Sequence, residues 1–258
     1  MKTYGIIPSR FGSSRFPGKP LAILAGKPLV AWVVEAVGKA KSLDEVLVAT
    51  DDERIAEAVR ACGGKAVMTP SSLPSGTDRI ACAAREFCAA NGGAADFGDD
   101  DILVNIQGDE PLIDPALVDG LALKLRTCAK WDMATAVTPV KSAADLAAKS
   151  VVKVVVDRDG GALYFSRAQI PCCRDGEPDI ASGLYVRHLG IYAYRGAFLK
   201  RYIEESPCDL EKTEKLEQLR ALWMGAKIAV VRTDDEGIGV DTPEDAERVS
   251  RILEHRSV

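Results

Sequence analysis

Short apolar runs alternate with amphipathic segments through the first half of the chain. Apolar runs of a few residues predict buried strands, and apolar positions three or four residues apart predict helices. The runs predict strands over Thr3–Ile7, Glu45–Thr50, Lys65–Thr69, Ile102–Ile106 and Met133–Val137. The helical spacing predicts helices over Leu29–Lys39, Glu53–Cys62, Thr77–Ala90 and Pro115–Cys128. This succession is typical of the α/β class with a doubly wound, mostly parallel sheet.

The pattern changes near Ser150, where strands no longer alternate with helices. Asp157–Gly161 has the composition of a hairpin turn, and Arg187–Tyr194 is a further apolar strand, so antiparallel pairing is expected here. The remaining predicted elements are strands over Val151–Val156, Ala162–Ser166 and Lys227–Arg232 and helices over Gly196–Glu205 and Lys212–Met224. A last helix should begin at Pro243, with Thr242 as its N-cap.

Composition narrows the class of protein. The 258 residues carry a net charge of -5, with 47% hydrophobic and 28% charged residues, as in ordinary globular proteins. The acidic balance argues against nucleic-acid binding, which needs a broad basic face. No apolar run approaches the roughly 20 residues of a membrane span, and the N-terminal pattern is not that of a signal peptide, so we expect a cytoplasmic protein. Seven cysteines without Cys-x-x-Cys spacing and only two histidines predict reduced thiols and no zinc site.

The loop IIPSRFGSSRFPGKPL, residues 6–21, concentrates positive charge directly after the first strand. It holds Arg10, Arg15 and Lys19, and the first acidic residue of the chain is Glu35. A glycine- and serine-rich turn at the carboxyl edge of such a sheet can surround a polyphosphate with backbone N–H groups and cations. The loop matches neither the Walker A nor the Gly-x-Gly-x-x-Gly pattern. Phosphate binding is the favoured interpretation, and a solvated surface loop is the alternative.

Two acidic residues follow apolar segments at positions where ligands bind. Asp109 comes after the strand of ILVNIQGDEP, residues 102–111, and Asp241 lies in GIGVDTP, residues 237–243. Carboxylates at the carboxyl edge of a sheet can hold Mg²⁺ against phosphate oxygens. Asp241 precedes the expected N-cap Thr242, so the cap does not require it. The two acids are candidates for one shared metal site, although the sequence alone does not place them together, and turn capping is the alternative role for each.

A third group of polar residues lies in the second half of the chain. His188 stands in the apolar strand RHLGIY, residues 187–192, with Arg167 upstream in LYFSR, residues 163–167. A lone histidine in an apolar strand is more often a hydrogen-bonded core residue than a functional group. The nearby arginines and tyrosines, which include Tyr192, make a polyhydroxy acid a plausible ligand.

Eight segments, spread in order over nearly the whole chain, together resemble the CMP-KDO synthetase (3-deoxy-manno-octulosonate cytidylyltransferase) family. They are IIPSRFGSSRFPGKPL, VATDDERIAEAV, PSGTDRIA, VNIQGDEPLI, LYFSRAQIP, RHLGIYAYR, EKLEQLRALW and GIGVDTPEDAERV. The joint presence of SRAQIP, RHLGIY and LEQLR is specific, whereas other sugar nucleotidyltransferases begin similarly. The resemblance implies a Rossmann-like nucleotidyltransferase fold and Mg²⁺-dependent transfer of CMP from CTP to the keto-sugar acid KDO. Pyrophosphate would be released, and the product would serve lipopolysaccharide biosynthesis.

The resemblance also implies roles for particular residues. The implied catalytic residues are Arg10, Lys19, Asp109 and Asp241, of which the two aspartates would ligate Mg²⁺. The implied nucleotide-binding residues are Pro8, Ser9, Arg10, Lys19, Ser75, Gly76, Arg79, Gln107 and Gly108. The implied sugar-acid-binding residues are Gln107, Arg167, His188, Tyr192, Glu217 and Gln218. Residues 1–150 would form the nucleotide-binding core, 151–226 the sugar-acid-binding and homodimerisation region, and 227–258 a strand and helix that return to the core, within one compact domain.

The chain departs from the family pattern at a few positions. Ser9 replaces a common alanine, and Cys172-Cys173 follows Ile170-Pro171 where many members carry Trp-Asp. The second change leaves open an altered acceptor, such as 8-amino-KDO. A nucleotide-sugar binding protein without turnover also remains open, as does an α/β interaction domain whose charges are merely solvated.

Overall fold

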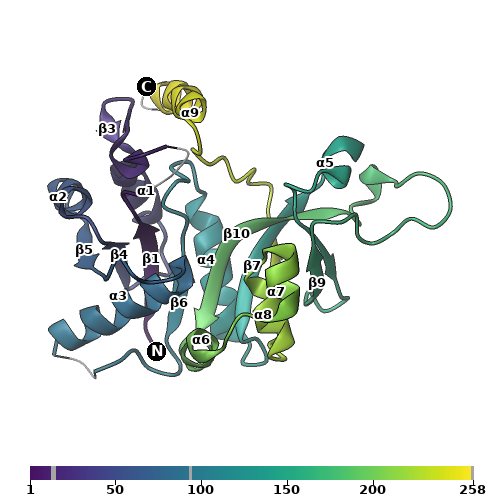
Figure 1. Ribbon diagram of the computed structural model, residues 1–258, viewed down its shortest axis with the longest axis horizontal. Coiled ribbons are helices and arrows are strands. Elements are labelled where there is room, and N and C mark those ends of the chain that lie inside the picture. Colours follow the sequence, from purple (N-terminus) through teal and green to yellow (C-terminus); the bar gives the residue numbers. More distant parts are fainter. Residues whose placement is uncertain (13–15, 93–94, 257–258) are drawn as a thin grey trace.

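The described residues of the computed structural model, 1–12, 16–92 and 95–256, form one large mixed sheet with helices on both faces (Figure 1). The main strand order is β11-β7-β10-β6-β1-β4-β5, and β8 and β9 extend the sheet from β10. The strands are β1 Thr3–Ser9, β4 Glu45–Thr50, β5 Lys65–Met68, β6 Ile102–Asn105, β7 Met133–Pro139, β8 Lys153–Val156, β9 Ala162–Ser166, β10 Val186–Arg195 and β11 Ile228–Arg232. A separate small hairpin joins β2 Ile23–Leu24 to β3 Lys27–Pro28. The predicted α/β class is confirmed.

Among the described residues, the main sheet has four parallel and four antiparallel strand pairs, and every antiparallel pair involves β8 or β10, where the sequence pattern changed. β1 pairs in parallel with β4 and β6, and β11 pairs in parallel with β7. β10 runs antiparallel to β6, β7 and β8, and β9 runs antiparallel to β8. β10 therefore lies between two parallel parts of the sheet and brings residues 186–195 next to the carboxyl end of β6.

The core has two parts because the strands bury both faces. Alternate side chains point to opposite faces of a strand, so Ile7 of β1 and Val104 of β6 join one cluster while Ile6 and Leu103 join the other. Helices α1 Leu29–Val37, α2 Glu53–Ala61, α4 Pro115–Thr127 and α9 Pro243–Arg256 cover the first cluster. Helices α3 Gly76–Ala90, α6 Gly196–Glu204 and α8 Gln218–Trp223 cover the second. This two-sided cover is the predicted doubly wound arrangement.

One predicted helix is wrong. The segment expected as a single helix over Lys212–Met224 forms two helices, α7 Asp209–Glu214 and α8, separated by Lys215 in the left-handed conformation (φ 54°, ψ 49°). The Arg167 side chain donates hydrogen bonds to the carbonyl oxygens of Glu214 (2.7 Å) and Lys215 (3.3 Å). A continuous helix would need these carbonyls for its own N–H groups. The other predicted elements are present with ends within two residues, while the β2–β3 hairpin and α5 Ala143–Ala147 were not predicted.

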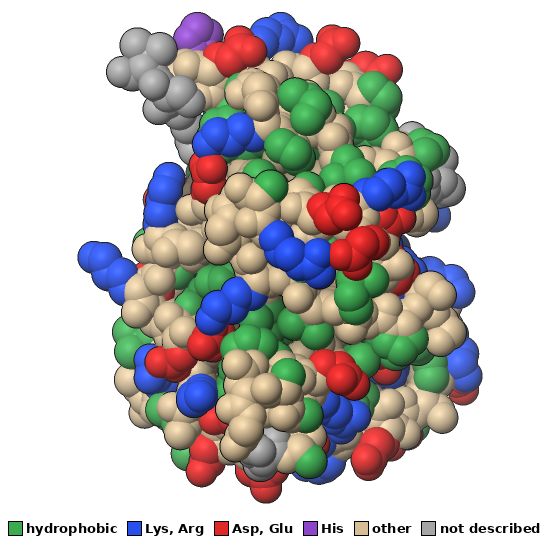
Figure 2. Space-filling model, turned by 90° about the vertical axis from the view of Figure 1, so that its left-hand side faces the viewer, with side chains coloured by type: hydrophobic (Ala, Val, Ile, Leu, Met, Phe, Trp, Pro, Cys, Tyr) green, Lys and Arg blue, Asp and Glu red, His purple; other side chains and the backbone are tan. Residues whose placement is uncertain are grey.

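Charge is mixed on the surface that carries α2 and β5. Figure 2 shows this side of the molecule, where blue and red side chains alternate and no extended basic area forms among the described residues. Several pairs here are salt bridges, such as Lys65 with Glu45 and Arg60 with Glu53. No helix in the described part of the chain is both long and apolar enough to cross a bilayer.

Candidate active site

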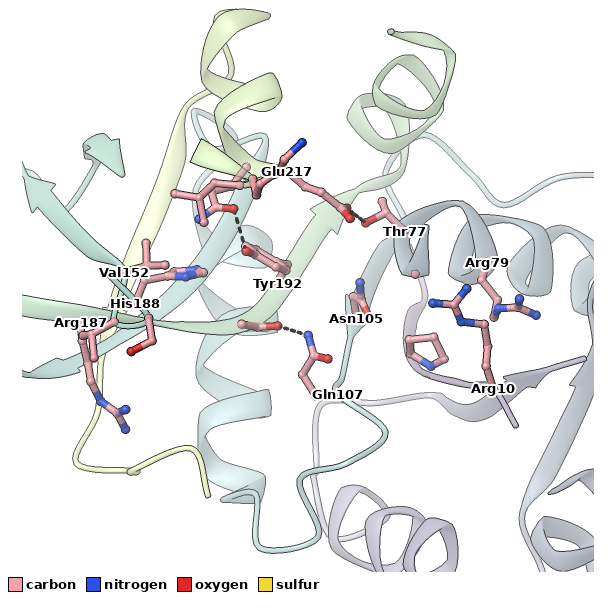
Figure 3. Close-up of a pocket in the computed structure, with 18 residues that line it drawn as sticks. Arg10, Thr77, Arg79, Asn105, Gln107, Val152, Arg187, His188, Tyr192 and Glu217 are labelled. Carbon is pink, nitrogen blue, oxygen red and sulfur yellow. Dashed lines mark hydrogen bonds between the residues drawn. The ribbon is translucent and has the colours of Figure 1, made fainter. Parts of the chain in front are cut away.

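A cavity of about 570 Å³ opens at the carboxyl ends of β1 and β6, beside β10 (Figure 3). Ligands of open α/β sheets bind at this edge. The cavity wall contains many of the predicted binding residues: Pro8, Arg10, Gly76, Arg79, Gln107, His188, Tyr192, Glu217 and Gln218. These residues come from segments far apart in the sequence, so the fold assembles them as the predicted sites require.

One side of the cavity carries fixed positive charge. Arg10 and Arg79 both line this side of the cavity (Figure 3). Arg79 is buried and held rigid, because its guanidinium donates to the Thr69 hydroxyl (2.6 Å) and to the Asp51 carboxylate (3.1 Å). The Arg10 side chain has no hydrogen bond or ion pair among the described residues, and it is exposed. Arg15, also part of the predicted basic loop, lies outside the described residues.

The start of α3 forms part of the same wall. The Ser75 hydroxyl caps the helix by accepting the Asp78 backbone N–H (3.2 Å). Gly76 follows at the first helical position, and a Cβ there would lie 3.7 Å from the Pro8 ring. The unpaired N–H groups of a helix N-terminus are suited to an anion or a polar ring. Ser75 therefore acts first as a cap, and Gly76 is the member of this pair that lines the cavity.

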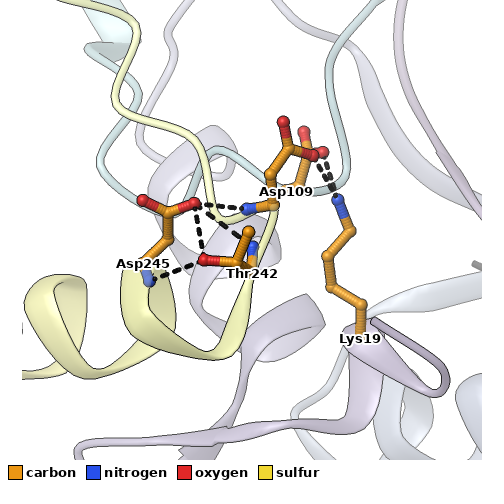
Figure 4. Close-up of polar contacts among 5 residues, drawn as sticks. Lys19, Asp109, Thr242 and Asp245 are labelled. Atoms are coloured by element: carbon orange, nitrogen blue, oxygen red, sulfur yellow. Dashed lines mark hydrogen bonds and ion pairs between the residues drawn. The ribbon is translucent and has the colours of Figure 1, made fainter. Parts of the chain in front are cut away.

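The two predicted metal ligands converge next to the cavity. The ammonium of Lys19 lies 2.5 Å from Asp109 Oδ2 and 3.3 Å from Asp241 Oδ1 (Figure 4). Thr242 caps α9 by accepting the Asp245 N–H (3.3 Å), as predicted, so Asp241 is not the cap. The backbone N–H of Val240 donates to the Asp109 carbonyl (2.9 Å) and joins the two loops. Two acids from distant segments therefore share one cation.

This carboxylate pair fits a hydrated magnesium ion. Its side chains remain partly exposed, 27% for Asp109 and 46% for Asp241, and a positive group already lies between them. Mg²⁺ commonly takes one or two carboxylates and completes its shell with water and phosphate oxygens. No cluster of three or more possible metal-ligating side chains occurs in the described chain, so two protein ligands are what these residues offer.

Glu110, directly after Asp109, lies in an unusual environment. Burial, together with the neighbouring carboxylates Asp109 and Asp235, raises its pKa to about 7. Glu110 therefore carries less negative charge near neutral pH than an ordinary exposed glutamate.

A break in the β10–β7 ladder shapes the opposite side of the cavity. The register shifts between Leu189 and Tyr192, which leaves Gly190 and Ile191 without partners on β7. The Gln107 side chain donates to the Gly190 carbonyl (2.6 Å), so this predicted binding residue is held against the bulge. Bulges often redirect side chains beside active sites. Here the bulge fixes Gln107 on one side and leaves His188 on the cavity wall.

The rest of this side carries several hydrogen-bonding groups, and the charged side chains of Arg187 and Lys215 also line the cavity. The Tyr192 hydroxyl donates to Gln218 Oε1 (3.2 Å), and the Thr77 hydroxyl donates to Glu217 Oε2 (3.2 Å). Burial raises the pKa of the Tyr192 phenol well above its usual value, and burial also raises the pKa of Glu217. The Gln218 Nε2 atom is buried and has no hydrogen-bond partner in the described chain. An unpaired buried donor indicates a place for a ligand oxygen.

Arg167 does not line the cavity, although a contact with the sugar acid was predicted. Its guanidinium is bound to the carbonyl oxygens of Lys149 (3.0 Å), Glu214 (2.7 Å) and Lys215 (3.3 Å). Five other predicted residues are also outside this wall. Lys19, Asp109 and Asp241 form the adjacent charged cluster, and the remaining two are Ser9 and Gly108. Arg167 instead supports the turn from which Glu217 and Gln218 reach the cavity.

Sequence reasoning missed several cavity residues. Asn105, only 5% exposed, lines the cavity, and its buried Oδ1 has no partner in the described chain. The sequence contained a signal for this residue. Asn105 stands in an apolar strand two residues before Gln107, and residues two apart in a strand share a face, so the two side chains should point the same way. Lys215 and the Ser150–Val152 rim also line the cavity. The buried ammonium of Lys153 supports that rim from below, and no short motif indicated it.

Comparison with known proteins gives one consistent result. A family model described as "Cytidylyltransferase" matches residues 4–228. The "3-deoxy-manno-octulosonate cytidylyltransferase" of Bdellovibrio bacteriovorus is 48% identical over 254 residues, which is 98% of each chain. The protein of the same name from Geobacter metallireducens is 47% identical over 260 residues, again 98% of each chain. A solved structure of CMP:2-keto-3-deoxy-manno-octonic acid synthetase complexed with CTP superposes with a TM-score of 0.88 at 40% identity, over 99% of this chain and 100% of that one.

Proposed function

We propose a reaction for this chain on the premise that it belongs to the cytidylyltransferase family, and within it to the 3-deoxy-manno-octulosonate cytidylyltransferases. The chain transfers CMP from CTP to KDO and releases pyrophosphate. The observation that carries this proposal is the convergence of Lys19, Asp109 and Asp241 beside a cavity lined by cations and by hydrogen-bonding groups. A triphosphate and a polyhydroxy acid need these two kinds of surface.

Binding of CTP is assigned to the cationic side. Arg10 and Lys19 lie where they would neutralise the triphosphate, and the Gly76 end of α3 lies against Pro8, where cytosine and ribose would bind. The guanidinium of Arg79 is held in place by Thr69 and by the carboxylate of Asp51, which partly balances its charge, so it needs no rearrangement to meet a ligand. Preorganised charge of this kind stabilises developing negative charge more effectively than mobile solvent does.

Binding of KDO is assigned to the side of the cavity formed by β10, where Arg187 and His188 lie. Gln107, His188, Tyr192 and Gln218 present hydrogen-bonding groups to its hydroxyls, and Gln107 also lies closest to the nucleotide half (Figure 3). The anomeric hydroxyl then attacks the α-phosphorus of CTP. The new O–P bond forms, the bond between the α-phosphorus and the bridging oxygen breaks, and the hydroxyl proton passes to water. The pyrophosphate leaves with that oxygen and its electron pair.

The chemistry depends on positioning and on neutralisation of charge, and no protein nucleophile is required. Asp109 and Asp241 would hold Mg²⁺. When bound, the ion supplies Lewis-acid stabilisation of the phosphoryl oxygens. The ammonium of Lys19, which contacts both carboxylates, would lie beside an ion held by them and could bind an outer phosphate.

The acceptor is proposed to be KDO itself. The replacement Cys172-Cys173, which raised the 8-amino analogue as an alternative, is not part of the cavity wall. Formation of a homodimer through residues 151–226 and a cytoplasmic location accompany the proposal. Exposed Leu163, Leu184 and Trp223 in that region are consistent with self-association, which light scattering would test.

The decisive experiment is a pyrophosphate-release assay with purified protein, Mg²⁺ and KDO. CTP should support turnover, and ATP, GTP and UTP should support far less. Parallel reactions with 8-amino-KDO compare kcat/KM for the two acceptors, and a strong preference for the amino sugar would replace KDO as the substrate. Binding of CTP at about 100 times its Kd should add roughly 2.7 kcal/mol of stability. Thermal stabilisation by CTP without any pyrophosphate release would instead support a binding protein without turnover.

A further inference from the structure

A single threonine hydroxyl on β7 contacts two carbonyl groups at the bulge in β10. Thr135 is fully buried on β7, opposite Tyr192. Its Oγ1 lies 2.8 Å from the carbonyl oxygen of Ile191 and 3.3 Å from that of Leu189. The same Oγ1 lies 2.9 Å from Nε2 of His188. Thr135 is not on the cavity wall, but it contacts the histidine that is.

The number of protons decides how these contacts are made. A threonine hydroxyl has one proton to donate and lone pairs to accept with. The 2.8 Å contact with the Ile191 carbonyl requires that proton, because two acceptor oxygens at this distance would otherwise repel each other. Thr135 Oγ1 must therefore accept a hydrogen bond from His188. Nε2 of His188 carries the proton, and Nδ1 carries a lone pair.

The lone pair on Nδ1 is available to a ligand. Nδ1 has no hydrogen bond to the described residues, and it is not among the polar side-chain atoms that are shut off from solvent. The imidazole is also uncharged near neutral pH, because burial lowers the pKa of His188 to about 3. The aromatic rings of Phe165 (5.1 Å between centroids) and Tyr192 (5.4 Å) pack against it and limit its rotation.

We propose that Thr135 is a positioning residue that holds His188 in the Nε2–H form, so that His188 presents only a neutral hydrogen-bond acceptor to the cavity. His188 then binds a hydroxyl group of the sugar acid, and it binds neither the carboxylate nor a phosphate. This assignment rests on the proposed function, since it takes the acceptor to be a polyhydroxy acid. It makes a hydroxyl of the acceptor, rather than its charge, the feature that His188 recognises.

The first experiment measures the tautomer of the intact protein without any ligand. Long-range ¹H–¹⁵N correlation spectra distinguish a protonated ring nitrogen from an unprotonated one. The chain has only two histidines, so a His255→Gln variant assigns the His188 signals. We expect a protonated Nε2 and an unprotonated Nδ1 near neutral pH. A protonated Nδ1 would overturn the proposal, and this measurement does not depend on any variant at position 135.

The second experiment removes the hydroxyl group of Thr135. Thr135→Val keeps the shape of the side chain, and Thr135→Ser keeps the hydroxyl. In the valine variant we expect a mixture of tautomers and a KM for KDO about 10-fold higher, the loss of roughly one neutral hydrogen bond. The KM for CTP should remain unchanged, and the serine variant should restore both the tautomer and the KM.

The outcomes separate this inference from the proposed function. An unchanged tautomer in Thr135→Val, or an equal rise in the KM for CTP and KDO, would show that Thr135 is only structural. Monodeoxy analogues of KDO add a direct test, because the analogue that lacks the bound hydroxyl should lose affinity for the wild type and not for the valine variant. Failure of the wild type to release pyrophosphate would refute the proposed function, and the tautomer of the free protein would still be measured on its own.

Discussion

Replacing Gly108 by alanine would move the metal-binding loop without removing any charge. Gly108 lies between β6 and Asp109, and a Cβ at this position would lie 2.7 Å from the carbonyl oxygen of Pro8, at the end of β1. Ordinary contact begins near 3.4 Å, so the two segments must separate by about 0.7 Å. Both are backbone, and no rotation of a side chain can relieve the clash. Asp109 should shift relative to Lys19 and Asp241.

The size of the effect follows from this displacement. Overpacking of a tight site costs about 1–3 kcal/mol, which lowers Tm by roughly 2–10 °C in a protein of this size. A misplacement approaching 1 Å can reduce a rate by about 10²-fold, so we expect kcat to fall by about 10- to 100-fold. Thermal denaturation and the pyrophosphate-release assay measure the two effects separately.

Gly120→Ala is the matched control. Gly120 lies within α4, and a Cβ there would meet its nearest neighbour, Val231 Cγ1, at an ordinary 3.6 Å. Alanine is favoured over glycine in a helix by about 1 kcal/mol, so Tm should stay the same or rise slightly and kcat should not change. A folded Gly108→Ala protein with wild-type kcat would refute the argument that the approach of Pro8 and Gly108 positions the acidic pair.

Three further predictions concern charge. Asp109→Asn and Asp241→Asn should each lower kcat by about 10²–10³-fold, because the lost charge would hold the metal ion. The free energy of unfolding should change by no more than about 1 kcal/mol, because the ion pair of each aspartate with Lys19 is partly exposed. Near-normal turnover in either variant would remove that residue from the metal site. Lys19→Ala should weaken use of CTP more than binding of CMP, and equal losses in titrations with both nucleotides would argue against contact with the outer phosphates. Burial lowers the pKa of His188 from 6.5 to about 3, so the unfolded chain binds the extra proton between these values and stability should fall with decreasing pH, by up to about 1.4 kcal/mol per unit. Denaturant unfolding at pH 5 and pH 7 should show this loss in the wild type and less of it in His188→Gln.

Much of the fold could be predicted because burial leaves a local record in the sequence. A buried strand needs a short apolar run, and a helix on a sheet needs an apolar face, so β1, β4 and β6 and the helices between them are visible without any structure. The cap of α9 is equally local, since Thr242 and Asp245 are three residues apart.

The candidate site was predictable only in part. The basic loop and the acids after β6 could be placed at one edge of the sheet from the alternation of elements alone. The helix break at Lys215 could not be predicted from the sequence. The side chain that donates hydrogen bonds to the carbonyl groups at this break belongs to Arg167, which lies 47 residues before Glu214. Intrinsic helix propensity is a weak preference that such a tertiary contact overrides.

The sequence by itself determined which segments are buried and which residues stand where strands end. The tertiary structure alone decided which of these ends meet. β10 could have paired at an edge of the sheet, but it lies between β6 and β7, and this brings Gly190 to Gln107 and His188 to Thr135. The bulge in β10 and the meeting of Asp109 with Asp241 have no local signature, because strand pairing and loop contact are chosen among distant segments by the packing of the whole core.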